Sequence, residues 1–174
     1  MGKMLVNKKV EDFINKIICD GYSDPLRIFR ELPDESVDCI VTSPPYWGLR
    51  NYNNISKSWK DWKGQLGLEP TFNMYINHLC DIFDEIKRVL KSSGTCWVNI
   101  GDRYSTSKSG IISKCLIGIP FRFTIEMINR GWILRNTIIW HKPNAMPSSV
   151  KDRFSVDFEY IFFFVKNQEY FFDQ

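Results

Sequence analysis

Two short apolar segments, residues 37–42 and 95–100, each end abruptly in a polar turn, and a long amphipathic segment lies between them. Apolar runs of this length that stop at turn residues favour strands of a buried sheet. From Pro70 to about Leu90, apolar residues recur every three or four positions, which indicates a helix that Gly94 is expected to stop. A strand, a helix and a second strand in this order predict a parallel sheet with a right-handed crossover.

The rest of the chain extends this pattern. We expect short helical segments before residue 33, a helix between Pro120 and Gly131, and two more strands at residues 134–140 and 158–165. The fold class is therefore α/β, with a mostly parallel sheet whose closing strands form an antiparallel edge pair. In such sheets ligands bind at the carboxyl ends of the strands, so the turns at 43–46 and 101–104 are the expected site.

Composition excludes several classes of protein. Hydrophobic residues make up 44% of the chain and aromatic residues 15%, too much for a disordered protein. The longest apolar run, about residues 160–165, is far shorter than the roughly 18 residues of a membrane span, so we expect a cytoplasmic protein without a membrane partner. The five cysteines form no Cys-x-x-Cys pair, which predicts no metal site, and Cys39 and Cys96 are expected to be buried. The net charge of +3 does not by itself indicate a polyanionic ligand.

The turn Ser43-Pro44-Pro45-Tyr46 carries the sharpest chemical signal. Two successive prolines fix two φ angles and remove two amide donors where a strand ends. A hydroxyl beside a rigid carbonyl offers two acceptors to one amino group, and the ring of Tyr46 offers a face on which a planar base can stack. Such a site suits an exocyclic amine on a heterocycle. The alternative is a stiff structural turn.

Two polar loops combine cations with aromatic rings or prolines, as surfaces that bind nucleic acid do. In the irregular insertion at residues 46–69, cations surround Trp59 and Trp62, and Trp47 could assist stacking. A second basic group follows residue 141. The alternative for both loops is an ordinary solvated surface. The candidate DNA-binding residues are Trp47, Arg50, Lys57, Lys60, Lys63, Lys142, Lys151 and Arg153.

Four other polar residues have more than one interpretation. Asp102 and Tyr104 follow the second strand, where a carboxylate can cap a turn as readily as it can serve a pocket. His141 follows a predicted strand, and a functional role is the less favoured of its two interpretations. His78 lies within the long predicted helix and is interpreted as structural or solvated.

An ordered series of segments resembles the DNA methyltransferases that modify exocyclic amino groups, in particular the branch specific for N4 of cytosine. The resemblance covers about residues 20 to 173. Its segments are residues 32–38, 42–52, 64–70, 88–90, 99–104, 131–135, 139–144 and 149–153, with Glu159 and Tyr160.

The resemblance implies a Rossmann-like methyltransferase sheet and a site-specific enzyme of the restriction-modification type, with S-adenosylmethionine as cofactor and double-stranded DNA as substrate. In this family the turn corresponding to Ser43, Pro44, Pro45 and Tyr46 is catalytic, and a serine in its first position favours cytosine over adenine. Acceptance of both amine hydrogens by Ser43 and the Pro44 carbonyl would direct the nitrogen lone pair at the methyl group. The base must first leave the duplex and stack, with Tyr46 as the expected platform. Methylation of adenine N6 is the alternative reaction.

One expected element is missing. Members of the family usually bind the methyl donor through a Gly-rich loop, and no Gly-x-Gly occurs in the 174 residues. In the permuted branch the catalytic half comes first, so we expect residues 1–174 to form one catalytic portion with an incomplete sheet. By itself, this chain is expected to bind the cofactor weakly or not at all. Three explanations stay open: a truncated chain, a split enzyme completed by a second polypeptide that carries the cofactor-binding half, or an inactive DNA-binding remnant.

Overall fold

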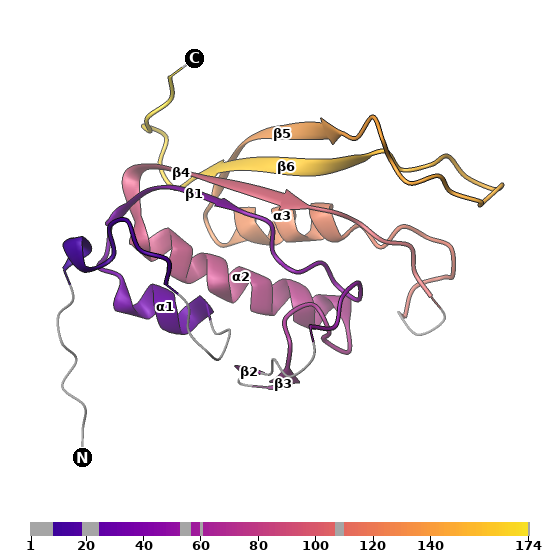
Figure 1. Cartoon of the computed structure of the whole chain (residues 1–174), viewed down its shortest axis with the longest axis horizontal. Helices are drawn as coiled ribbons and strands as arrows, with labels where there is room; N and C mark the ends of the chain where they lie inside the picture. Colours follow the sequence, from indigo (N-terminus) through magenta and orange to yellow (C-terminus); the bar gives the residue numbers. More distant parts are fainter. Residues whose placement is uncertain (1–8, 19–24, 53–56, 60, 107–109, 174) are drawn as a thin grey trace.

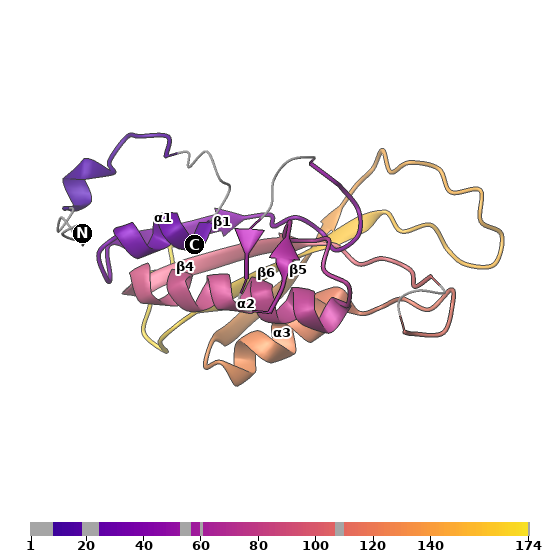
Figure 2. The same cartoon turned by 90° about the horizontal axis from the view of Figure 1, so that it is seen from below.

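A computed structural model describes residues 9–18, 25–52, 57–59, 61–106 and 110–173. Three helices, α1 (Pro25–Glu31), α2 (Phe72–Val89) and α3 (Ile119–Asn129), cover one face of a four-stranded sheet (Figures 1 and 2). The remaining described elements are a 3₁₀ turn η1 (Val10–Asp12) and a small antiparallel pair, β2 (Lys57–Ser58) and β3 (Lys63–Gly64). Among the helices of the described ranges, none has the length and apolar character needed to cross a bilayer.

The sheet has the order β1-β4-β6-β5, formed by β1 (Val37–Thr42), β4 (Leu90–Ile100), β6 (Phe158–Val165) and β5 (Ile133–His141). β1 and β4 are parallel, whereas β6 runs antiparallel to both of its neighbours. The predicted α/β class, with parallel strands and an antiparallel pair at one edge, is confirmed. The insertion of β6 between β4 and β5 explains why Phe162, Phe163 and Phe164 are nearly completely buried.

Helix α2 provides most of the core that faces the sheet. Thr71 caps its first turn by accepting a hydrogen bond from the Met74 amide at 3.2 Å. Its buried side chains, including Tyr75, Leu79 and Phe83, recur with helical spacing and pack against β4 and α3. The predicted helix is confirmed.

The expected stop at Gly94 is wrong. The helix ends at Val89 and the chain enters β4 directly at Leu90, so that Gly94 lies inside a strand. A Cβ atom at Gly94 would lie 2.8 Å from the Leu90 side chain and 2.9 Å from the Asp38 carbonyl oxygen. The glycine is therefore needed for a close approach between β1 and β4, not for a helix cap.

The prediction that Cys39 is buried is also wrong, whereas Cys96 is buried as expected. The difference follows from position in the sheet. β4 lies between two strands, but β1 is an edge strand of the described sheet, and the face of β1 that points away from the helices leaves Val41 79% exposed.

Candidate active site

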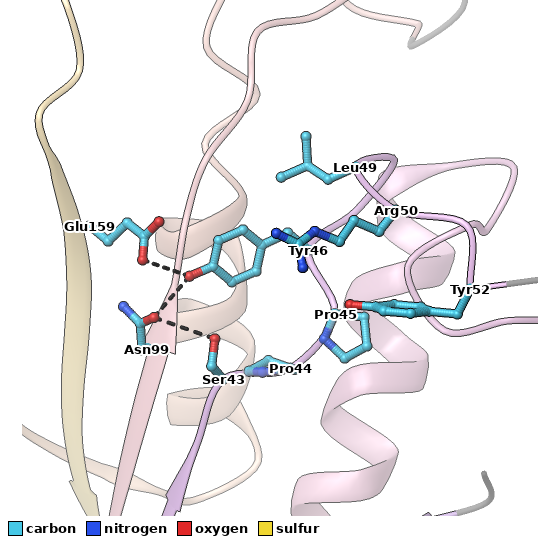
Figure 3. Close-up of a pocket in the computed structure, with 9 residues that line it drawn as sticks. All are labelled: Ser43, Pro44, Pro45, Tyr46, Leu49, Arg50, Tyr52, Asn99 and Glu159. Carbon is cyan, nitrogen blue, oxygen red and sulfur yellow. Dashed lines mark hydrogen bonds between the residues drawn. The ribbon is translucent and has the colours of Figure 1, made fainter. Parts of the chain in front are cut away.

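A cavity of about 500 Å³ opens where β1 and β4 end (Figure 3). This volume lies within the range of small-molecule sites, roughly 300–1,000 Å³. The turn after β1, the loop that follows it, β4 and β6 all contribute to its wall. The lining residues are Ser43, Pro44, Pro45, Tyr46, Leu49, Arg50, Tyr52, Asn99 and Glu159.

The predicted Ser-Pro-Pro-Tyr turn lies directly at this cavity. The Pro45 carbonyl accepts a hydrogen bond from the Tyr75 hydroxyl of α2 at 2.9 Å, which fixes the turn to the helix layer. Within the described part of the chain, no donor contacts the Pro44 carbonyl. The Ser43 hydroxyl and the Pro44 carbonyl are therefore the two adjacent oxygens of the turn from which an incoming amine could be recognised.

Asn99 of β4 orients the polar atoms of the turn. Its Oδ1 accepts a hydrogen bond from Ser43 Oγ at 3.3 Å and lies 2.9 Å from the Tyr46 hydroxyl. Its Nδ2 donates to the Tyr160 carbonyl at 3.2 Å, and this contact determines which end of the amide faces the turn. Since the Ser43 proton points to Asn99, the lone pairs of Oγ stay available as acceptors.

Tyr46 is held at both ends. Its hydroxyl lies 2.8 Å from Glu159 Oε2, and the ring packs against the backbone of Gly101, where a Cβ atom would approach Tyr46 Cε2 to 2.7 Å. Burial, together with the neighbouring Glu159, raises the pKa of the Tyr46 hydroxyl, so that it stays protonated and donating at neutral pH. Burial acts to raise the pKa of Glu159 as well, but hydrogen bonds from Lys142 and Tyr46 outweigh it and keep this pKa below its ordinary value.

The prediction that Trp47 assists stacking in the pocket is contradicted by its position. Trp47 is 8% exposed and belongs to the core. Its Nε1 donates to the Glu69 carbonyl at 2.9 Å, and its ring meets Phe72 edge to face. The start of α2 buries the apolar indole of Trp47. The Arg103 guanidinium lies over the same ring, with its Cζ 5.5 Å from the ring centroid.

The described cations of the first loop lie in different places. Arg50 lines the cavity, and Lys63 is exposed on β3. The side chain of Lys57 and the whole of Lys60 lie outside the described residues. Trp59 and Trp62 are partly buried and stack on the ring of His78, at 4.2 and 6.1 Å between ring centroids. For these two indoles the structure favours the interpretation as packing residues.

The three cations of the second basic group also lie in different places. Lys142 forms an ion pair with Glu159 at the cavity wall, so its ammonium group positions the Glu159 carboxylate. Lys151 is exposed on the long loop between β5 and β6. The Arg153 guanidinium stacks on the Tyr104 ring at 3.8 Å beside a second cavity of about 480 Å³.

Asp102 and the two histidines have structural partners. Asp102 accepts hydrogen bonds from the amides of Gly118 and Ile119 and so caps the start of α3. His78 is buried between Glu69 and Asp61, at 3.1 and 2.8 Å. His141 is exposed and lies 3.7 Å from Asp157. Within the described ranges, no group of three or more His, Cys, Asp or Glu side chains could hold a metal ion.

Sequence reasoning assigned no role to Asn99 or to Glu159, although both lie in the cavity wall. A signal for Asn99 exists, because it is the polar residue within the apolar run 96–100, next to the end of β4 where ligands bind. Glu159 is the acidic residue in the aromatic strand β6. Its contact with Tyr46 spans 113 positions of sequence, and no local pattern predicts it.

Comparisons with known proteins agree with this geometry. The profile of a DNA methylase family, which covers N6 and N4 methylases, matches residues 37–174. The type II methyltransferase M.Cfr9I of Citrobacter freundii is 42% identical over a match that covers 86% of this chain and 55% of the relative. The chain thus spans about half the length of the curated relatives it matches.

Two solved structures share the fold. The PvuII DNA methyltransferase (cytosine-N4-specific) superposes with a TM-score of 0.65 at 23% identity, covering 85% of this chain and 49% of that one. The TTHA0409 protein of Thermus thermophilus, solved in complex with S-adenosyl-L-methionine, gives a TM-score of 0.61 at 21% identity, covering 87% of this chain and 54% of that one. Because the family profile matches most of the chain, this protein belongs to the DNA methylase family of N6 and N4 methyltransferases.

Proposed function

We propose that this chain is the catalytic portion of a DNA methyltransferase that transfers a methyl group from S-adenosylmethionine to the exocyclic N4 of cytosine. The observation that carries the proposal is the pair of adjacent acceptors, Ser43 Oγ and the Pro44 carbonyl, beside a cavity of about 500 Å³. Membership of the DNA methylase family supports the reaction class. The serine in the first position of the turn supports cytosine, as does the name of the PvuII enzyme, which shares the fold.

The proposed chemistry depends on the geometry of the amine. The lone pair of the cytosine N4 is delocalised into the ring, which makes this nitrogen a poor nucleophile. Two acceptors placed at the two N–H bonds favour a pyramidal nitrogen whose lone pair points away from the turn. The Ser43 hydroxyl can accept a hydrogen bond because it donates its proton to Asn99 Oδ1. The Tyr46 ring, held by Asn99 and Glu159, supplies the face on which the extruded base stacks.

The residues present fit one end of the methyl donor. The cavity wall, with the oxygens of Ser43 and Asn99 and the Glu159 carboxylate, would lie beside the sulfonium, and S-adenosylmethionine would supply an electrophilic methyl group. The described residues include no Gly-rich loop for its nucleoside and amino-acid ends. We therefore infer that a further segment, or a second polypeptide that carries the cofactor-binding half, completes the enzyme.

Duplex DNA is the proposed substrate, and the cytoplasm is the proposed place of action, with a role in restriction-modification. Lys63, Lys151 and Arg153 are the proposed phosphate contacts, since all three side chains are exposed. Lys57 and Lys60 remain predicted contacts of the same kind. Lys142 has a different proposed role, since its ion pair holds Glu159 against Tyr46.

Base identification tests the proposal without knowledge of the recognition sequence. The chain is expressed alone, and together with the coding sequence that follows it, in a host without DNA methylation, and the genomic DNA is hydrolysed for mass spectrometry. N4-methylcytosine that disappears with Ser43→Ala is the expected result. N6-methyladenine instead would assign the other reaction of the family, and no methylated base with either preparation would contradict an enzymatic role.

A further inference from the structure

We propose that Arg50 reads the Watson–Crick edge of the flipped cytosine and is not a phosphate contact. This inference rests on the proposed function and assigns a specificity-determining residue to it. Arg50 lines the same cavity as Ser43 and Pro44, and of the nine described lining residues it is the one with a positive charge. The opposite wall carries acceptors from Ser43, Asn99 and Glu159.

The backbone that carries Arg50 is fixed by a buried glutamine. Gln65 is 7% exposed, its Nε2 donates to the Arg50 carbonyl at 2.8 Å, and its Oε1 accepts from the Tyr52 amide at 2.8 Å. One buried amide therefore holds the backbone of Arg50 and Tyr52, two of the three loop residues that line the cavity. A backbone held in this way limits the positions that the Arg50 guanidinium can reach, as a contact to a base edge at a fixed position requires.

A second set of contacts fixes the turn that precedes Arg50. The Gly48 amide donates to the Gly67 carbonyl at 2.6 Å, and the Arg103 guanidinium donates to the Gly48 carbonyl at 2.8 Å. Figure 3 shows that Arg50 and Tyr52 both point from this loop back toward the turn and the end of the sheet. The guanidinium thus faces the space where a base would bind.

The chemistry of the two candidate bases explains why a guanidinium suits cytosine. In cytosine, N3 and O2 are adjacent acceptors on the same edge as the N4 amine, so the parallel N–H groups of a guanidinium can bind both. In adenine, the N6 amine is followed by one acceptor, N1, and then by a carbon-bound hydrogen. An arginine that binds two acceptors therefore favours cytosine, and a good bidentate contact to a base is worth roughly 5- to 150-fold in discrimination.

Two measurements separate base reading from phosphate binding. The first uses the purified chain and duplex DNA of random sequence, and follows the binding constant as a function of salt concentration. Each lost phosphate contact lowers the slope of log K against log salt by about 0.9. The second is the yield of N4-methylcytosine in the host assay, with the coding sequence that follows the chain included. The variants are Arg50→Gln, Arg50→Lys and, as a phosphate comparator, Lys63→Gln.

Base reading predicts that Arg50→Gln leaves the salt slope unchanged and lowers the yield of N4-methylcytosine about 5- to 150-fold. Arg50→Lys should lose most of this yield as well, since an ammonium cannot bind two acceptors in parallel. Arg135→Gln, at the opposite end of the sheet, is the matched control and should change neither quantity. A slope reduced by about 0.9, or an unchanged yield, would overturn the inference and leave the proposed function intact. A parent chain that forms no N4-methylcytosine contradicts the proposed function instead, and the salt slope still decides whether Arg50 binds phosphate.

Discussion

Ser43 Oγ lies 3.3 Å from Asn99 Oδ1 and donates its proton to it, although 56 positions separate the two residues in the sequence. The Tyr160 carbonyl fixes the orientation of the Asn99 amide from the other side. A residue of the neighbouring strand β4 therefore orients the hydroxyl of the proposed catalytic turn. A hydroxyl that donates to Asn99 presents only lone pairs to an incoming amine.

Loss of the Asn99 acceptor tests this relationship. In Asn99→Leu the Ser43 hydroxyl is free to rotate, and its proton can point at the amine instead of away from it. We expect kcat to fall on the order of 10- to 100-fold, with little change in the affinity for DNA. Asn99→Asp keeps an acceptor for Ser43 and should retain more activity than the leucine variant.

A double-mutant cycle provides the control for Asn99. If the side chain acts through the Ser43 hydroxyl, Asn99→Leu should have little further effect on kcat once Ser43 is alanine. Equal losses in both backgrounds would mean that Asn99 acts independently of Ser43.

The close packing of Tyr46 on Gly101 gives a stability prediction. A methyl group at position 101 would lie 2.7 Å from Tyr46 Cε2, closer than any van der Waals contact permits. Gly101→Ala should lower the free energy of unfolding by about 1–3 kcal/mol in a urea titration, because the ring must move. The same substitution in a Tyr46→Ala background should cost less. A cost that does not depend on Tyr46 would show that another contact limits this position.

The two histidines form a matched pair for a second stability test. His78 is 3% exposed and is the hydrogen-bond partner of Glu69 Oε1, whose side chain is fully buried, whereas His141 is exposed. Burial raises the pKa of the Glu69 carboxyl, because the charged form is costly in the core. Removal of His78 leaves this buried carboxyl without that hydrogen-bond partner, which destabilises the fold. We expect His78→Ala to destabilise the protein by about 3–5 kcal/mol and His141→Ala by less than about 0.5 kcal/mol. Similar midpoints of thermal unfolding for the two variants would contradict this assignment.

The pH dependence of stability reports on Glu159. Its pKa is lowered in the folded protein, against the effect of burial, by hydrogen bonds from Lys142 and Tyr46. A lowered carboxyl pKa stabilises the fold above the unfolded value of 4.5, and this contribution is lost as the pH falls through the folded pKa. The stability difference between the parent and Glu159→Gln should therefore be constant above about pH 6 and shrink as the pH falls toward 3. A difference that grows on acidification would mean that the carboxylate is not stabilised by these donors.

Local sequence patterns predicted the parts of the fold that local physics determines. The period of apolar residues in α2 and the strand ends at Thr42 and Ile100 are all visible in the sequence. The helix boundary was missed because Gly94 serves a contact with β1, which only the assembled sheet contains. The position of β6 between β4 and β5 likewise depends on strand pairing between distant segments.

The candidate site was predictable to a similar extent. Ser43, Pro44, Pro45 and Tyr46 are consecutive, so the turn itself shows the adjacent acceptors and the aromatic face. Asn99 and Glu159 reach the turn from other strands, and their roles depend on hydrogen bonds across 53 and 113 positions. Trp47 was misassigned because composition does not distinguish an indole that stacks on a ligand from one that is buried under a helix.

The most direct test of the central claim is the single-turnover rate of methyl transfer to cytosine by Ser43→Ala and by the parent, each assembled with the donor-binding segment. Because Ser43 is exposed, the variant should fold and bind DNA of random sequence as the parent does. The account predicts a rate lower by a factor on the order of 100, since one of the two acceptors for the amine is lost. A rate equal to that of the parent would contradict the claim that this turn activates the amine by accepting its hydrogens.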